Sequence, residues 1–278
     1  MNYQELESIA HQIRSEIIYA NFMATSATHS SPALSCTELL TVLYFKILNI
    51  DPQNPRWENR DRFILSKGHA YLAYYAILAK RGFFPMEELP SVRSINSILQ
   101  GHPDMNKTPG VDMTTGSLGN GLSIGAGMAL YAKSKQRAFK VYVMIGDGES
   151  QEGAIWEAAL TSSALKLDNL ICIIDYNHYQ SNGIVDDIVP MHSMDEKWRA
   201  FGWDVLIVNG HEMNEIYSAL EIARNSKGRP TIIIANTVKG KGVSFMTHNN
   251  EWHAKQLTQS EYEIAAKELE EARHADRI

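Results

Sequence analysis

A glycine-flanked aspartate and an asparagine each follow an apolar run of strand length. Gly146-Asp147-Gly148 comes directly after residues 141–145, and Asn177 comes shortly after residues 170–174. Glycines at a strand-to-helix turn let a ligand approach the backbone, and the helix start attracts anions. An aspartate there would repel a phosphate unless a divalent cation lay between them. The Asp147 carboxylate, the Asn177 amide oxygen and a nearby backbone carbonyl form an oxygen-only half shell suited to Mg²⁺ or Ca²⁺.

The spacing of these two motifs carries more information than either motif alone. A Gly-Asp-Gly tripeptide by itself also describes an ordinary turn. The 28 residues between Gly148 and Asn177 are long enough for one crossover helix and one strand. Adjacent parallel strands would then place Asp147 and Asn177 side by side at the same edge of a sheet.

Histidines stand in a second group of glycine-rich or non-periodic segments. His69 lies in Ser66-Lys67-Gly68-His69-Ala70, His102 lies in Gly101-His102-Pro103, and a glycine-rich stretch follows at residues 114–121. His29 also lies in a segment without helical periodicity. A single histidine is more often a structural residue than a catalyst. Because histidine titrates near neutrality, several around one site predict proton relay and hydrogen bonding to hydroxyl groups.

The elements that would position these residues alternate between strands and helices. Apolar, β-branched runs at residues 141–145, 170–174, 203–208 and 231–234 are typical of strands covered on both faces. Helical patterns occupy residues 152–165 and 213–224 between them, residues 6–20 and 71–79 before them, and residues 258–278 after them. The pattern predicts an α/β fold with a parallel sheet flanked by helices on both faces, and ligands bind beyond the carboxyl ends of such strands.

The composition is that of a globular protein. The 278 residues include 26 basic and 32 acidic side chains, with a formal net charge of −6 and an apolar content of 44%. These values exclude a disordered chain or a membrane protein and argue against a nucleic-acid surface. Cys36 and Cys172 each lie in an apolar run, which predicts buried free thiols. Without a visible leader or linker, we expect one domain over residues 1–278 and a cytoplasmic location.

Together these motifs resemble the N-terminal, thiamine diphosphate-binding domain of the transketolase family. Other thiamine diphosphate enzymes share the Gly-Asp-Gly to Asn element but lack the Ser-Lys-Gly-His-Ala and Gly-His-Pro elements. The resemblance covers essentially the whole chain. The matching segments are residues 65–70, 101–103, 115–119, 146–148 with 152–153, Asn177, 239–242 and 252–253.

The resemblance implies a role for each matching residue. The metal ligands would be Asp147, Asn177 and the main-chain carbonyl of Tyr179, holding Mg²⁺, with Ca²⁺ or Mn²⁺ as substitutes. Gly148 would contact the diphosphate, Gly116 and Leu118 the cofactor rings, and Glu152 would be the interface glutamate near the aminopyrimidine. The catalytic histidines would be His29, His69, His102 and His253, of which His69 and His253 also face the diphosphate.

The resemblance also implies what a partner must supply. Full-length transketolases carry a second, pyrimidine-binding domain, and no stretch of this chain matches it. We therefore expect the N-terminal subunit of a split transketolase, active only with a separately encoded C-terminal subunit, in the form of a heterotetramer. It would transfer a two-carbon ketol unit from a ketose or its phosphate to an aldose or its phosphate. The family pattern Gly-His-Pro-Gly-Gly is replaced at residues 28–32 by Thr-His-Ser-Ser-Pro, and Ser181-Asn182-Gly183 replaces Ile-Asp-Gly.

Other functions fit the sequence less well. A nicotinamide-binding oxidoreductase would need Gly-x-Gly-x-x-Gly after a strand, but the glycines at 119, 121 and 125 are spaced one residue too far apart and no strand precedes them. The α subunit of a 2-oxo-acid dehydrogenase is closer, but would lack the His69 and His102 motifs. A non-catalytic partner protein is the third alternative, and the retained histidines and both types of metal ligand argue against it.

Overall fold

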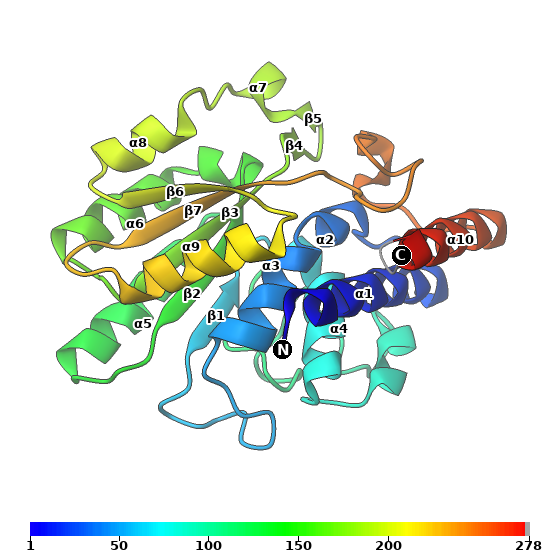
Figure 1. Ribbon diagram of the computed structural model, residues 1–278, viewed down its shortest axis with the longest axis horizontal. Helices are drawn as coiled ribbons and strands as arrows, with labels where there is room; N and C mark the ends of the chain where they lie inside the picture. The colour runs from blue at the N-terminus through cyan, green and yellow to red at the C-terminus, as the bar shows by residue number, and fades with distance from the viewer. Residues whose placement is uncertain (276–278) are drawn as a thin grey trace.

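The computed structural model describes residues 1–275 and is built around a parallel β-sheet (Figure 1). Its five strands lie in the order β1-β2-β3-β7-β6, and every neighbouring pair is parallel. The strands are β1 (Arg62–Leu65), β2 (Val141–Gly146), β3 (Leu170–Tyr176), β7 (Thr231–Asn236) and β6 (Asp204–Asn209). The predicted parallel sheet is confirmed, with one further strand, β1, formed by the apolar residues before the His69 motif.

The inner strands are buried on both faces, as their continuous apolar sequences predict. All of β2 and nearly all of β3 is buried. The strand β6 differs, because it forms one edge of the sheet and Ile207 is 53% exposed. The expectation that residues 203–208 are covered on both faces is therefore wrong. A continuous apolar run does not distinguish an inner parallel strand from an edge strand.

One face of the sheet packs against the helices α1 (Tyr3–Met23), α3 (Thr37–Val42), α4 (Tyr71–Arg81) and α9 (Met213–Asn225). The helix α1 begins with a capping box between Asn2 and Glu5 and buries a stripe that includes Leu6, Ile13 and Ile17. The helix α10 (Gln259–Ala275) packs on α1, where Tyr262 stacks on Phe22. The predicted helix at residues 258–278 is confirmed as far as residue 275, and its last three residues lie outside the described part of the chain.

The opposite face packs against α5 (Asn120–Ser134), α6 (Gly153–Ala164) and α8 (Met194–Ala200). Figure 1 shows these helices on the side of the sheet away from α1 and α10. Alternate residues of the strands pack into the two hydrophobic cores, one on each face of the sheet. Tyr142 and Met144 point to the α1 side, and Val141 and Val143 point to the α5 side. Helices therefore cover both faces of the sheet, which confirms the predicted fold class.

Several short elements connect the main helices and strands. They are α2 (Ser31–Ser35), α7 (Val185–Ile188), the hairpin strands β4 (Tyr179–Gln180) and β5 (Gly183–Ile184), and single helical turns at Leu43–Ile47, Gly68–Ala70, Met86–Ser91, Gly148–Gln151 and Asn250–His253. Both cysteines are buried and unpaired, as predicted. None of the helices in residues 1–275 is long and apolar enough to cross a bilayer.

Candidate active site

Asp147 and Asn177 lie together beyond the tips of β2 and β3. Gly146 is paired in register with Asp175, so the chain segments that follow the two strands emerge side by side. The Asp147 carboxylate accepts hydrogen bonds from the backbone N–H of Gly148 at 2.8 Å and from that of His178. The Asn177 amide oxygen accepts one from the backbone N–H of Tyr179 at 3.0 Å. The predicted juxtaposition of this carboxylate and this amide is confirmed.

A pocket of about 380 Å³ opens above these residues. Every residue predicted from the sequence to belong to the site lines it: His29, His69, His102, Gly116, Leu118, Asp147, Gly148, Glu152, Asn177, Tyr179 and His253. Segments far apart in the sequence therefore meet at the carboxyl edge of the sheet, where ligands bind in open parallel sheets.

Three of the histidines form a compact group within this pocket. The ring of His29 lies 5.6 Å from that of His69 and 5.3 Å from that of His253, and the His69 and His253 rings lie 5.4 Å apart, between ring centroids. His102 lies farther along, with its ring 6.2 Å from that of Tyr71. Such a group can surround the hydroxyl groups of one small polar substrate.

These histidines are neutral at physiological pH. Burial, with help from His102, lowers the pKa of His29 to about 4, and burial together with the Lys239 ammonium lowers the pKa of His253 to about 3. Burial also lowers the pKa values of His69 and His102. The expectation that they titrate near neutrality does not hold in this environment, because each ring is desolvated near other cationic groups.

Glycines shape the walls of the pocket at two places where a side chain would not fit. Gly116 has a φ of +141°, and an added Cβ would lie 3.1 Å from Cδ2 of His102. At Gly148 an added Cβ would lie 2.8 Å from Cβ of Gln180. Glycine at these two positions therefore lets His102 and Gln180 pack directly against the backbone of the pocket wall.

The oxygen atoms near Asp147 fit a hard divalent cation. Within residues 1–275 no group of three or more histidine, cysteine, aspartate or glutamate side chains could hold a metal ion. A metal here would depend on one carboxylate with amide and carbonyl oxygens, which favours Mg²⁺ or Ca²⁺ over zinc. Burial and the nearby Asp175 carboxylate raise the pKa of Asp147 to about 7, and a cation would relieve that unfavourable burial.

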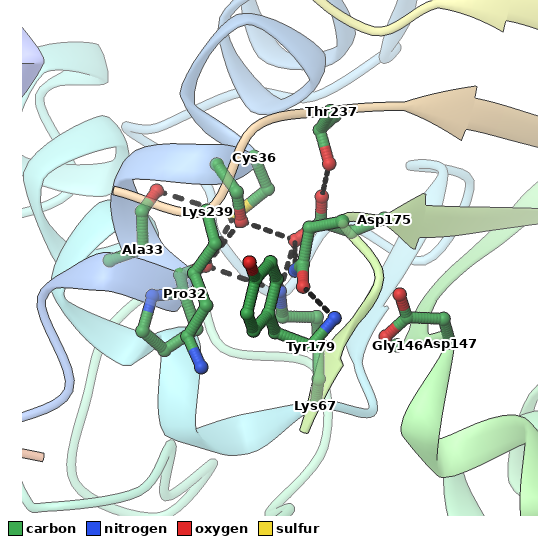
Figure 2. Close-up of polar contacts among 12 residues, drawn as sticks. Pro32, Ala33, Cys36, Lys67, Gly146, Asp147, Asp175, Tyr179, Thr237 and Lys239 are labelled. Carbon is green, nitrogen blue, oxygen red and sulfur yellow. Dashed lines mark hydrogen bonds and ion pairs between the residues drawn. The ribbon is translucent and has the colours of Figure 1, made fainter. Parts of the chain in front are cut away.

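A buried ion pair lies beneath the pocket floor. Lys67 donates to the Asp175 carboxylate and, at 3.1 Å, to the backbone carbonyl of Pro32. Figure 2 shows Asp175 between Lys67 and Thr237, which also donates to it. The Asn177 amide nitrogen donates to the same carboxylate at 3.3 Å. Asp175 therefore fixes which way the Asn177 amide faces.

Comparison with known proteins assigns the family. The family model for "transketolase, thiamine diphosphate binding domain" matches residues 8–272. The chain belongs to the transketolase family. The assignment made from its motifs is therefore confirmed.

Other members of the transketolase family match along most of this chain. It is 46% identical over 242 residues to the 6-deoxy-6-sulfo-D-fructose transketolase subunit SqwG of Clostridium sp. (strain MSTE9), covering 87% of this chain and 88% of that one. It is 41% identical over 271 residues to a subunit of the apulose-4-phosphate transketolase of Phocaeicola vulgatus, covering 98% of this chain and 96% of that one.

Solved transketolases share the fold. The crystal structure of Campylobacter jejuni transketolase superimposes with a TM-score of 0.88 at 31% identity, covering 97% of this chain and 43% of that one. Human transketolase is 39% identical over 270 residues, which is 96% of this chain and 42% of the human protein. The chain thus spans less than half of these full-length transketolases, and nearly all of the two subunits above.

Several residues of this transketolase-family site have no role that the sequence alone predicts. Lys67 lies in the Ser-Lys-Gly-His-Ala motif and Asp175 lies two residues before Asn177, but nothing in the local sequence indicates that they pair across the sheet edge. Glu149 accepts hydrogen bonds from Ser66 and from the backbone N–H groups of Gly119 and Gly146, and so joins three loops of the pocket. The position of Glu149 directly after Gly-Asp-Gly could have indicated a role in the site, but the sequence does not show that its side chain is buried.

Replacing Lys67 with methionine should lower the free energy of unfolding by about 3–5 kcal/mol, because Asp175 would remain buried without its cation. Urea denaturation of the purified chain measures this change. Lys133→Met is the matched control, since it removes a half-exposed ion pair with Asp168 whose nitrogen and oxygen lie 3.5 Å apart. That control should change stability by less than about 1 kcal/mol. Equal effects of the two substitutions would contradict a structural role for the buried pair.

Proposed function

We propose that this chain is the thiamine diphosphate-binding subunit of a two-chain transketolase. It forms a single diphosphate-binding domain and transfers a two-carbon ketol unit from a ketose or its phosphate to an aldose or its phosphate. The observation that carries this proposal is the shared pocket in which Asp147 and Asn177 lie beside His29, His69 and His253. A cytoplasmic location is part of the same proposal.

The cofactor would be held at the carboxyl edge of the sheet. Asp147, Asn177 and the Tyr179 carbonyl would bind Mg²⁺, with Ca²⁺ or Mn²⁺ as substitutes, and Gly148 would face the diphosphate. When bound, thiamine diphosphate supplies the nucleophilic carbon and the electron sink for breaking a carbon–carbon bond. Gly116 and Leu118, which line the same pocket, would contact its rings.

The histidines bind and orient the sugar hydroxyls. Lys239 Nζ lies 3.2 Å from His253 Nδ1, and since an ammonium group only donates, Nδ1 accepts and the ring proton lies on Nε2. Neutral His29, His69 and His102 each offer one donor and one acceptor to substrate oxygens. Their shared desolvation favours proton transfer among hydroxyl groups over exchange with bulk water.

A separately encoded partner would complete the site. Both of the shorter relatives are named as subunits of transketolases, and full-length transketolases are more than twice as long as the matched region. Leu118 is 39% exposed at the pocket rim, and Glu152 is also exposed there. We propose that a pyrimidine-binding subunit covers this rim, with Glu152 at the contact, and that two copies of each chain form a heterotetramer.

The substrate class follows from the same relatives. One is named for a sulfonated ketose and another for a phosphorylated sugar. We therefore propose that the donor is a ketose with an anionic group far from its carbonyl.

Co-expression with the partner, followed by a two-carbon transfer assay over a panel of ketoses, tests the proposed function. The panel includes 6-deoxy-6-sulfofructose, apulose 4-phosphate and pentulose phosphates. Transfer should require both thiamine diphosphate and Mg²⁺, and chelation of the metal should abolish it. Transfer that persists at the full rate after removal of either one would contradict the proposed cofactor site.

A further inference from the structure

A buried polar network lies behind the active site, on the side of α1 and α3. Arg14 on α1 donates to the Glu38 carboxylate on α3, and His211 in the β6–α9 turn lies 3.1 Å from the second oxygen of Glu38 through Nδ1. The three side chains are only 4%, 6% and 8% exposed. None of them lines the active-site pocket.

The hydrogen bonds of His211 define its protonation. The backbone N–H of Val238 donates to Nε2 of His211 at 2.8 Å. A backbone N–H cannot accept, so Nε2 carries no proton, and Nδ1 carries the proton donated to Glu38. Glu38 therefore selects the tautomer that leaves Nε2 free to hold the Val238 backbone.

Val238 begins a loop of residues 238–241, and Glu38 and Arg14 also hold the other end of this loop. The Arg14 Nε donates to the carbonyl of Lys241 at 3.4 Å, and Lys241 Nζ lies 3.7 Å from Glu38. Although burial alone would raise it, Arg14, His211 and Lys241 hold the pKa of Glu38 well below its usual range. The carboxylate thus stays charged while it joins both ends of residues 238–241.

The middle of this loop reaches into the active site. Lys239 lines the pocket and lies over the ring of Tyr179, with Nζ 5.4 Å from the ring centroid (Figure 2). Its ammonium donates to Asn250 at 2.6 Å and to His253. The position of the Lys239 backbone therefore decides whether this ammonium reaches His253.

We propose that Glu38 and His211 are positioning residues, which hold residues 238–241 so that Lys239 and His253 are correctly placed in the pocket. This proposal rests on the proposed function for its catalytic consequence. The network contributes no side chain to the lining of the active-site pocket. It acts through the Val238 backbone, one residue from the side chain that lines the pocket.

Paired substitutions of His211 separate a positioning role from a general loss of packing. His211→Gln retains an acceptor for Val238 and a donor for Glu38, whereas His211→Leu removes both. Hydrogen–deuterium exchange of the isolated chain should show the Val238 amide exchanging about tenfold or more faster in His211→Leu, and within about threefold of wild type in His211→Gln. Glu38→Gln serves as a second variant if His211→Leu does not fold, and should also speed this exchange.

The same variants are then assayed in complex with the partner. We expect kcat to fall about 10–100-fold in His211→Leu, with recovery in His211→Gln, as for outer residues that orient functional groups. Glu7→Gln is the control. Glu7 lines a second pocket together with Glu38 and His211, but it has no hydrogen bond to residues 238–241 within the described part of the chain. Wild-type exchange at Val238 or an unchanged kcat in His211→Leu would overturn the proposal. An inactive wild-type complex would instead refute the proposed function, while the exchange result still decides the positioning of the loop.

Discussion

Replacing Asp147 with alanine is expected to weaken thiamine diphosphate binding to the assembled enzyme by more than about 100-fold, since even outer residues of metal sites contribute about 10–100-fold. Asp147 supplies the negative charge at the proposed metal site, and the neutral oxygens of Asn177 and Tyr179 would not replace it. Because burial opposes ionisation of Asp147, the metal-free variant should fold normally. Calorimetric titration of the complex with thiamine diphosphate in the presence of Mg²⁺ measures the change.

A matched control for this substitution lies on α7. Asp187 is exposed and does not line the pocket, so Asp187→Ala should leave cofactor affinity within about twofold of wild type. Wild-type affinity in Asp147→Ala would show that this carboxylate does not hold the metal. Higher Mg²⁺ concentrations should restore part of the binding if Asn177 and the carbonyl of Tyr179 still coordinate.

Replacing His253 with alanine is expected to lower kcat for two-carbon transfer by about 10²–10⁴-fold, the usual contribution of one positioned acid–base group. The ring of His253 lies beside those of His29 and His69, and Lys239 fixes the proton on its Nε2. Its loss removes a donor to the substrate and leaves the Lys239 ammonium with one partner fewer. Steady-state assays of the complex over a range of donor concentrations measure kcat and KM separately.

His192 provides the control for this second substitution. It is exposed in the loop before α8, and His192→Ala should leave both constants within about twofold of wild type. A normal kcat in His253→Ala would exclude His253 from the chemical step. An unfolded His253→Ala variant is not expected, because the ring lies on the pocket wall and not in either hydrophobic core.

The sheet could be predicted from the sequence because its strands are short, apolar and β-branched on both faces. The runs at residues 141–145 and 170–174 became β2 and β3 with little change in their bounds. The exposed edge strand β6 was not predictable, because its side chains resemble those of the inner strands. Its place at the edge depends on the order of the strands in the sheet, and the local sequence of a strand does not show that order.

The composition of the site could also be predicted, but its energetics could not. The spacing between Gly-Asp-Gly and Asn177 predicts that the two motifs meet, because neighbouring strands place the residues after β2 and β3 together. Contacts such as Lys67 with Asp175 or His211 with Val238 join residues distant in the chain, without any motif that links them. The low pKa values of the histidines arise from burial, which only the folded structure defines.

Mixing this chain with its separately encoded partner is the most direct test of a shared active site. The chain is held at a fixed concentration with thiamine diphosphate, Mg²⁺ and a ketose donor, and the partner is titrated. Two-carbon transfer should be undetectable without the partner and should rise to a plateau near an equimolar ratio. Transfer by this chain alone at the plateau rate would contradict an active site completed by a second polypeptide.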